Sequence, residues 1–182
     1  MKKILFITAL LCLSLACRKR LDSFLFNPSQ IESYQLDAYQ GELTLDLNGQ
    51  YNVPDSMIHQ LQWDVELEEG NAKMSAIYVG DINSIATDTV ILYCHGNKDH
   101  MDFYWPRQKL YANTGGLGRY GVLMFDYPSF GLSEGKASEA NMYRSTARAI
   151  QWLKDQGLQN ERFVIFGFSL GSAAACEVAI AA

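Results

Sequence analysis

Residues 162–171 read R-F-V-I-F-G-F-S-L-G, and this stretch decides the fold that we predict for the chain. Its first part, Phe163 to Phe166, is an apolar run of the kind that forms a buried strand. Gly167 to Gly171 then shows the pattern G-x-S-x-G around Ser169, and a run of small residues that permits a helix follows. Strand, glycine-flanked serine and helix, in that order, are the setting in which this pattern forms a nucleophile elbow.

The chemistry of an elbow explains why these residue types stand at this spacing. The serine occupies a tight, strained turn that projects its hydroxyl into a cleft, and glycines leave room where neighbouring backbones crowd that turn. The helix that starts just after Ser169 points its first N–H groups at negative charge that develops there. Since G-x-S-x-G also occurs by chance, the alternative is a Gly/Ser loop between a strand and a helix of some other α/β protein.

Two further apolar runs lie upstream, Thr89 to Cys94 and Gly121 to Phe125, and both suit parallel strands that are covered on both faces. Helical segments separate the three runs. The first is Met101 to Asn113, which Pro106 should make begin late or kink. The second is Ser138 to Gln156, which Ser138 can cap and Gly157 can stop, with an apolar stripe that we expect from Tyr143, Ala147, Ile150 and Leu153.

Alternating polar and apolar residues dominate before residue 88, a pattern typical of strands with one wet face. Gln60 to Glu68 and Lys73 to Val79 flank a turn and predict an antiparallel hairpin. Glu42 to Leu47 alternates in the same way and predicts another strand. Antiparallel strands first and β-α-β units later predict an α/β fold: a mixed, mainly parallel sheet with helices on both faces.

Composition excludes several classes of function. The 182 residues suit one domain, and the net charge of −5, without a Lys/Arg cluster beyond the N-terminus, argues against a nucleic-acid partner. The four cysteines lack the spacing of a zinc site, and we expect Cys94 and Cys176 to be small buried hydrophobic residues rather than a disulfide. The sequence implies no metal and no organic cofactor.

The N-terminus has the layout of a signal peptide. Lys2 and Lys3 precede the mostly apolar run from Ile4 to Ala16, which is shorter than the roughly 20 residues that span a membrane. We therefore divide the chain into a signal peptide at 1–16, a tether at 17–30 and a folded domain at 31–182.

Cys17 follows the signal as a candidate for lipidation. L-S-L-A-C resembles the lipobox of bacterial lipoproteins, although Ser14 stands where an aliphatic residue is usual. We expect an exported protein that an acylated Cys17 tethers to a membrane surface. The alternatives are a periplasmic or secreted protein and an uncleaved membrane anchor.

Three motifs follow the three apolar runs in order. Tyr93 to Asn97 ends in H-G-N, Asp126 to Gly135 reads D-Y-P-S-F-G-L-S-E-G, and Gly167 to Gly171 is the G-x-S-x-G. From about Trp63 onward the chain resembles the α/β-hydrolase family, most closely its membrane-associated serine hydrolases, which carry H-G-N and D-Y-x-x-x-G-x-S-x-G. It departs from that pattern at Pro128-Ser129, where the family often has Arg-Gly, so this loop could be shaped differently.

This resemblance implies a role for each matching residue. Ser169 would be the nucleophile, and the backbone N–H groups of Leu170 and Asn97 would form the oxyanion hole. His95 would order the oxyanion loop rather than act as the catalytic base, and Asp126 would be a structural acid that caps the turn after its strand.

A general base and its orienting carboxylate are also needed, and in the family they follow the serine. After Ser169 the sequence holds Glu177, about 12 Å away along a helix, but neither histidine nor aspartate. The outer side of the third parallel strand would also lack a partner. We therefore expect residues 31–182 to be the N-terminal part of a longer hydrolase, truncated after the elbow helix, and His59 and His100 to be solvated loop residues.

The expected activity is that of a serine hydrolase of the carboxylesterase or thioesterase type, acting on a small-molecule or acyl substrate. One alternative is a peptidase of the aminopeptidase-like branch, which would use the same acyl-serine chemistry. The other is a catalytically inactive chain that keeps the architecture without a complete triad.

Overall fold

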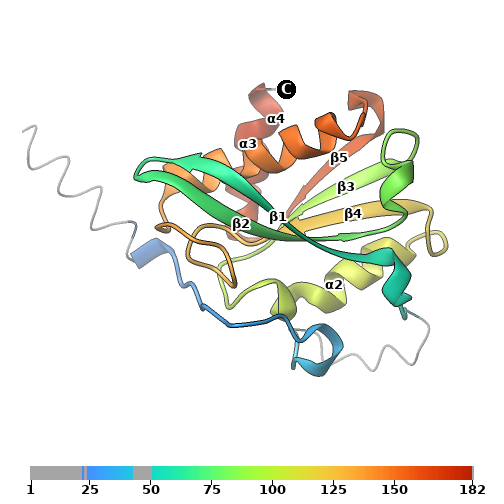
Figure 1. The fold of residues 1–182 in the computed structure, drawn as a ribbon, viewed down its shortest axis with the longest axis horizontal. Helices are drawn as coiled ribbons and strands as arrows, with labels where there is room; N and C mark the ends of the chain where they lie inside the picture. Colours follow the sequence, from blue (N-terminus) through green and yellow to red (C-terminus); the bar gives the residue numbers. More distant parts are fainter. Residues whose placement is uncertain (1–21, 23, 43–50, 182) are drawn as a thin grey trace, which may run out of the picture.

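The computed structural model describes residues 22, 24–42 and 51–181, which form three layers (Figure 1). A five-stranded sheet with the order β1-β2-β4-β3-β5 has α2 on one face and both α3 and α4 on the other. This is the predicted α/β architecture. The elements are β1 (Ile58–Leu67), β2 (Gly70–Val79), β3 (Thr89–Cys94), α2 (Met101–Asn113), β4 (Tyr120–Phe125), α3 (Glu139–Asp155), β5 (Phe163–Gly167) and α4 (Leu170–Ala181).

The strand pairing confirms the predicted hairpin and the predicted parallel runs. β1 and β2 are antiparallel, with Ile58 opposite Val79 and Leu67 opposite Gly70. β2 also pairs antiparallel with β4, while β3 pairs in parallel with β4 on one side and β5 on the other. Because β2 lies inside the sheet, its residues from Met74 to Val79 are buried on both faces.

Two apolar cores hold the layers together. Trp63, Leu92 and Phe125 belong to the core beneath α3 and α4, where Trp152 stacks on Trp63 with ring centroids 5.5 Å apart. The other core packs α2 onto the opposite face of the sheet and includes Tyr93 and Trp105. Burial of this apolar area is the main favourable term for the fold.

Helix α2 spans Met101–Asn113, as predicted, and Pro106 lies inside it, so of the two predicted effects of Pro106 the late start is wrong. Pro106 packs against Gly41, where an added Cβ would lie 2.6 Å from its Cγ. At α3 the predicted cap is confirmed, because the Ser138 hydroxyl accepts a hydrogen bond from the backbone N–H of Asn141 at 3.1 Å.

The buried face of α3 differs from the predicted stripe. Ile150 and Leu153 are buried as expected, but Ala147 is exposed and Tyr143 is only partly buried. Three polar residues of α3 are buried instead, Asn141, Ser145 and Thr146, and the last two carry hydroxyl groups. Their hydroxyls donate to the Met142 carbonyl at 2.7 and 2.8 Å, so they satisfy their polar groups within the helix.

The two cysteines at described positions differ in exposure. Cys94 is buried at the end of β3, as predicted, and burial raises the pKa of its thiol to about 12. Cys176 is exposed, which corrects the expectation for this residue. Helix α4 turns Ala174 and Val178 to the core, and Cys176 lies between them on the outer side.

Strand β5 lies at one edge of the sheet and, in the described part of the chain, pairs only with β3. Its Val164 and Phe166 side chains are 44% and 37% exposed. None of the described helices is long and apolar enough to cross a membrane. The proposed signal peptide, Cys17 and nearly all of the predicted strand at 42–47 lie outside the described residues.

Candidate active site

The three motifs meet where the carboxyl ends of strands β3, β4 and β5 lie together. Because these strands are parallel, their carboxyl ends lie side by side, and loops from these ends form the sites of open α/β sheets. Asn97 follows β3, Asp126 follows β4, and Ser169 follows β5. The N–H of Phe168 donates to the Cys94 carbonyl at 3.0 Å, so the loop before Ser169 is bonded directly to the end of β3.

Ser169 has the backbone conformation of an elbow. Its φ of 53° lies in the left-handed region, which costs a non-glycine residue about 1–3 kcal/mol. Two backbone hydrogen bonds hold the turn: Gly171 N–H to the Phe168 carbonyl at 3.0 Å and Ser172 N–H to the Ser169 carbonyl at 2.9 Å. The Ser169 side chain is exposed, and α4 begins at the next residue.

Both glycines of the motif are required by close backbone contacts. A Cβ on Gly167 would lie 2.4 Å from the Gly171 carbonyl oxygen and 2.6 Å from the Cα of Ser172. A Cβ on Gly171 would lie 2.0 Å from the Cys94 carbonyl oxygen and 2.6 Å from that of His95. The first contact lets α4 fold back on β5, and the second lets α4 pack against the end of β3.

The two residues predicted to form an oxyanion hole lie on segments that touch. Leu170 is the first residue of α4, so its N–H belongs to the free first turn of that helix. Asn97 follows Gly96, where an added Cβ would lie 3.1 Å from the Phe168 ring and 2.7 Å from the Tyr104 hydroxyl. The loop that carries Asn97 therefore packs on the residue before Ser169.

His95 is fully buried beneath this loop. Its Nδ1 lies 2.8 Å from the Gly96 carbonyl, and its Nε2 lies 3.1 Å from Oδ1 of Asp126, outside hydrogen-bond alignment. The rings of Tyr104 and Tyr127 lie 5.0 and 4.5 Å from the imidazole, between centroids. Both ring nitrogens thus face groups other than Ser169, which fits a role in ordering the loop.

Asp126 links three parts of the chain rather than capping its own turn. Oδ1 accepts from the Met101 N–H at 2.9 Å, and Oδ2 accepts from the Tyr34 hydroxyl at 2.6 Å. Burial, with the nearby Asp126 carboxylate, raises the pKa of Tyr34 well above its ordinary range, so its hydroxyl remains a donor. A Cβ on Gly131, whose φ is 53°, would lie 1.9 Å from Oδ2, so this carboxylate also requires a glycine in its loop.

The other two histidines are not the solvated loop residues that the sequence suggested. His100 is buried at the start of α2, with Nδ1 3.7 Å from Oδ2 of Asp102. His59 lies in β1, with Nε2 3.1 Å from the Gly80 carbonyl. Within residues 22, 24–42 and 51–181, no group of three or more His, Cys, Asp or Glu side chains is arranged to hold a metal ion.

Arg107 is a neighbour of the elbow that sequence reasoning missed. Its guanidinium lies 4.0 Å from the ring centroid of Phe168 and forms a two-point ion pair with Glu42. The bond to Glu42 raises the pKa of Arg107 above its ordinary value. Glu42 lies 65 positions earlier in the chain, so no local pattern could have signalled this contact.

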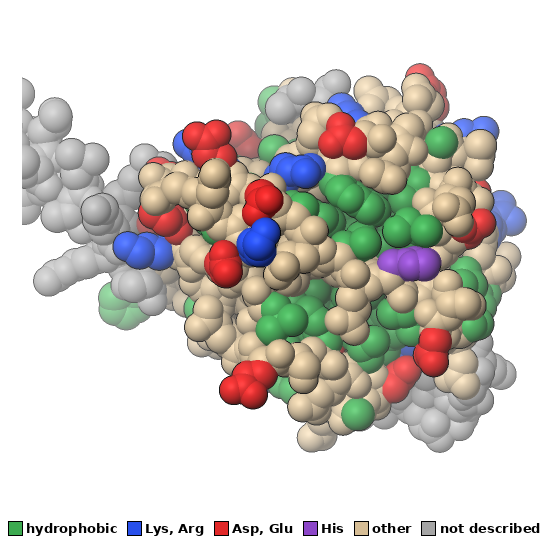
Figure 2. Space-filling model, in the orientation of Figure 1, with side chains coloured by type: hydrophobic (Ala, Val, Ile, Leu, Met, Phe, Trp, Pro, Cys, Tyr) green, Lys and Arg blue, Asp and Glu red, His purple; other side chains and the backbone are tan. Residues whose placement is uncertain are grey.

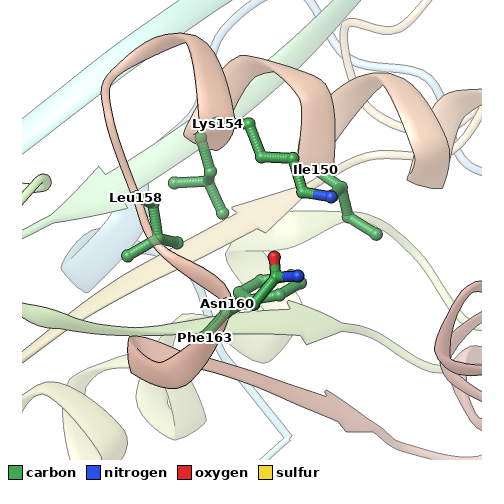
Figure 3. A pocket seen from close by; sticks show the side chains of 6 residues that line it. Ile150, Lys154, Leu158, Asn160 and Phe163 are labelled. Atoms are coloured by element: carbon green, nitrogen blue, oxygen red, sulfur yellow. The ribbon is translucent and has the colours of Figure 1, made fainter. Parts of the chain in front are cut away.

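The described part of the surface also has hollows that Ser169 does not line. On the face shown in Figure 2, acidic and basic side chains are interspersed rather than gathered by sign. An apolar hollow lies between the end of α3 and the start of β5, lined by Ile150, Leu153, Lys154, Leu158, Asn160 and Phe163 (Figure 3). It borders the amino end of β5, whereas Ser169 follows the carboxyl end of the same strand.

Comparison with known proteins agrees with this fold. A family model described as alpha/beta hydrolase fold matches residues 89–182. Uncharacterized protein YfhR of Escherichia coli K12 is 35% identical over 97 residues, which is 53% of this chain and 32% of that protein. Lysophosphatidylserine lipase ABHD12 of Danio rerio is 37% identical over 115 residues, 60% of this chain and 28% of its own length.

Solved structures share the fold at low sequence identity. The Pyrococcus furiosus esterase Pf2001 superposes with a TM-score of 0.53 and 20% identity, over 84% of this chain and 51% of that one. The aligned part of the chain spans about a third of the length of the curated relatives that it matches. On the family match, the chain belongs to the α/β-hydrolase fold family.

Proposed function

We propose that this chain carries the nucleophile and the oxyanion hole of a serine hydrolase of the carboxylesterase or thioesterase type. The observation that carries the proposal is the left-handed backbone of Ser169 at a strand–helix junction packed against the loop of Asn97. A serine gains nothing in stability from that conformation, and strained residues of this kind gather at active sites.

The reaction would proceed in two steps. The Ser169 oxygen attacks the substrate carbonyl carbon while its proton passes to a general base, which the family resemblance places after the serine but which residues 170–182, with no histidine, do not supply. The backbone N–H groups of Leu170 and Asn97 stabilise the negative oxygen that forms. Collapse breaks the ester or thioester bond, and the alcohol or thiol leaves with the proton. Water then attacks the acyl-serine and releases the carboxylic acid.

An acyl ester substrate is supported by the name of one relative, lysophosphatidylserine lipase ABHD12. We propose in addition that the protein is exported and that an acylated Cys17 holds it at a membrane surface, because L-S-L-A-C follows a signal-like N-terminus. Transfer of labelled palmitate to the protein in a bacterial host tests this. Cys17→Ala should abolish the label, and Cys12→Ala, a cysteine inside the apolar run, should retain it.

The competing function is a chain that binds without turnover. This alternative is favoured by the position of His95. Its two ring nitrogens lie against Gly96 and Asp126, so they do not face Ser169 as a general base would. A peptidase of the aminopeptidase-like branch is the other alternative, and it differs from an esterase only in the bond that it cleaves.

A fluorophosphonate probe decides between an active and an inactive site. We expect covalent labelling of Ser169 that disappears in Ser169→Ala and persists in Ser172→Ala, a matched control at an exposed serine in the same helix turn. Protein labelled at Ser169 should hydrolyse neither nitrophenyl esters nor aminoacyl anilides. The hydrolysis rates of unlabelled protein on these two substrates distinguish an esterase from a peptidase. Lack of labelling in the unaltered chain would exclude the proposed hydrolase for this chain.

A further inference from the structure

The segment before the sheet, residues 25–34, contacts the candidate oxyanion loop from two sides. We propose that this segment is a positioning element: it holds the loop of residues 95–99 in the geometry that presents the Asn97 backbone N–H beside Ser169. The inference rests on the proposed function, because it assigns a catalytic purpose to the position of that N–H group.

The direct contact is made by the Asn97 side chain. Its Oδ1 accepts a hydrogen bond from the backbone N–H of Asn27 at 2.8 Å, and its Nδ2 donates to the backbone carbonyl of Leu25. A carboxamide offers a donor and an acceptor together, and this pair of backbone groups uses both. The clamp therefore fixes the residue whose main chain is the candidate oxyanion donor, and asparagine is the residue type that the clamp requires.

The segment is itself anchored on both sides of the clamp. Phe26, between the two clamping residues, is buried in the core beneath α3 and α4. Pro28 forms a parallel β-bridge with Asp99, at the end of the same loop. Asp99 has a φ of 50°, in the left-handed region that aspartate and asparagine enter more readily than other non-glycine residues. Figure 1 shows residues 24–42, drawn in blue, crossing below the β1–β2 hairpin toward α2.

An indirect contact reaches the loop from beneath. The Tyr34 hydroxyl donates to Oδ2 of Asp126, and Oδ1 of Asp126 lies against Nε2 of His95. The other nitrogen of His95 meets the carbonyl of Gly96, the residue before Asn97. Residues 25–27 thus hold the outer side of the loop, and Tyr34 supports its buried side through two intermediates.

The expected effect on catalysis can be bounded. Removing one oxyanion donor outright lowers kcat by about a hundredfold to a thousandfold. Loosening a donor that remains present is less severe, and a misplacement of about 1 Å costs up to about a hundredfold. Loss of the clamp should therefore lower kcat by roughly tenfold to a hundredfold while KM stays within about twofold, since substrate binding elsewhere is untouched.

The test compares Asn97→Ala, which removes the clamp but keeps the backbone N–H, with Gln30→Ala, which removes an exposed carboxamide from the same segment. Amide hydrogen exchange of residues 95–99 reports loop order. The rate constant for fluorophosphonate labelling of Ser169, and kcat and KM on a nitrophenyl ester, report its catalytic consequence. Tyr34→Phe tests the buried support independently, should the first variant fold poorly.

We expect faster exchange of the loop amides and a tenfold to hundredfold slower labelling in Asn97→Ala, and behaviour within twofold of the unaltered protein in Gln30→Ala. Unchanged loop exchange in both Asn97→Ala and Tyr34→Phe would overturn the inference, as would faster exchange with an unchanged labelling rate. If the unaltered protein is not labelled at all, the proposed hydrolase fails, and the exchange data still decide whether the segment orders the loop.

Discussion

Gly171→Ala should be one of the most damaging small substitutions in the chain. The added methyl group would lie 2.0 Å from the Cys94 carbonyl oxygen, 2.5 Å from its carbon and 2.6 Å from the His95 carbonyl oxygen. Non-bonded heavy atoms are at their best separation near 3.5–4.0 Å. Relief of the overlap therefore requires that α4 or the end of β3 move by more than about 1 Å.

Two opposing effects set the size of the loss. Alanine is a better helix former than glycine by about 1 kcal/mol, which would favour the variant. Overpacking of a tight contact typically costs 1–3 kcal/mol, and more where nothing can yield. Here the obstructing atoms are backbone atoms at the end of β3, a strand with neighbours on both sides, so they cannot rotate away as a side chain could. We expect the free energy of unfolding to fall by about 2 kcal/mol or more.

Urea unfolding, followed by tryptophan fluorescence, measures this change, and the fluorophosphonate labelling rate of Ser169 measures its effect on the elbow. Ala173→Gly is the matched control, because Ala173 is exposed two residues farther along the same helix. It should lose about 1 kcal/mol from helix propensity alone and label normally. If Gly171→Ala were as stable as the unaltered protein and labelled at the same rate, the packing of α4 against β3 would not be as described.

Ser169→Gly should raise the free energy of unfolding by about 1 kcal/mol relative to Ser169→Ala, because glycine adopts a φ of 53° without strain, while both variants lose labelling; equal stability in urea would contradict the strained turn. Cys176→Ser should reduce the number of thiols that react rapidly with Ellman's reagent by one, whereas Cys94→Ala should not change it. Burial raises the pKa of the Cys94 thiol in the folded protein to about 12, above its ordinary value of 9.0. The stabilisation that depends on the protonated thiol is therefore complete below pH 9 and is lost as the pH rises toward 12. Between pH 9 and 11, the free energy of unfolding should fall more steeply with pH for the unaltered protein than for Cys94→Ala. Val164 is exposed on the edge strand β5, and an exposed apolar edge can pair with another copy of the chain. Val164→Lys should therefore reduce light scattering by concentrated protein without lowering the urea midpoint. Unchanged scattering would exclude this edge as the surface through which the protein self-associates.

Much of the sheet was predictable because local chemistry encodes it. The apolar runs that became β3 and β4 are mostly buried, and the alternating runs that became β1 and β2 mark the hairpin. The run at 163–166 also became a strand, β5, but Val164 and Phe166 are exposed, so the predicted burial of this strand is wrong. The elbow was also predictable, since strand, glycine, serine, glycine and helix are contiguous in the chain.

Contacts between distant segments were beyond the reach of sequence patterns. Arg107 pairs with Glu42, and Asn97 bonds to Asn27, across large separations in sequence. The burial of His100 depends on how helix α2 is rotated about its axis. The stripe on α3 failed for a related reason. Ser145 and Thr146 bond to their own helix, so polarity did not keep them at the surface.

The route of residues 25–34 has a consequence for the order of folding. The segment's bonds to Asn97, Asp126 and Leu132 span 70, 92 and 98 positions, so they can form only after β3 and β4 have assembled. Closing such long loops carries an entropy cost that local contacts do not share. We therefore expect this early-synthesised segment to dock last, and to undock before the sheet unfolds.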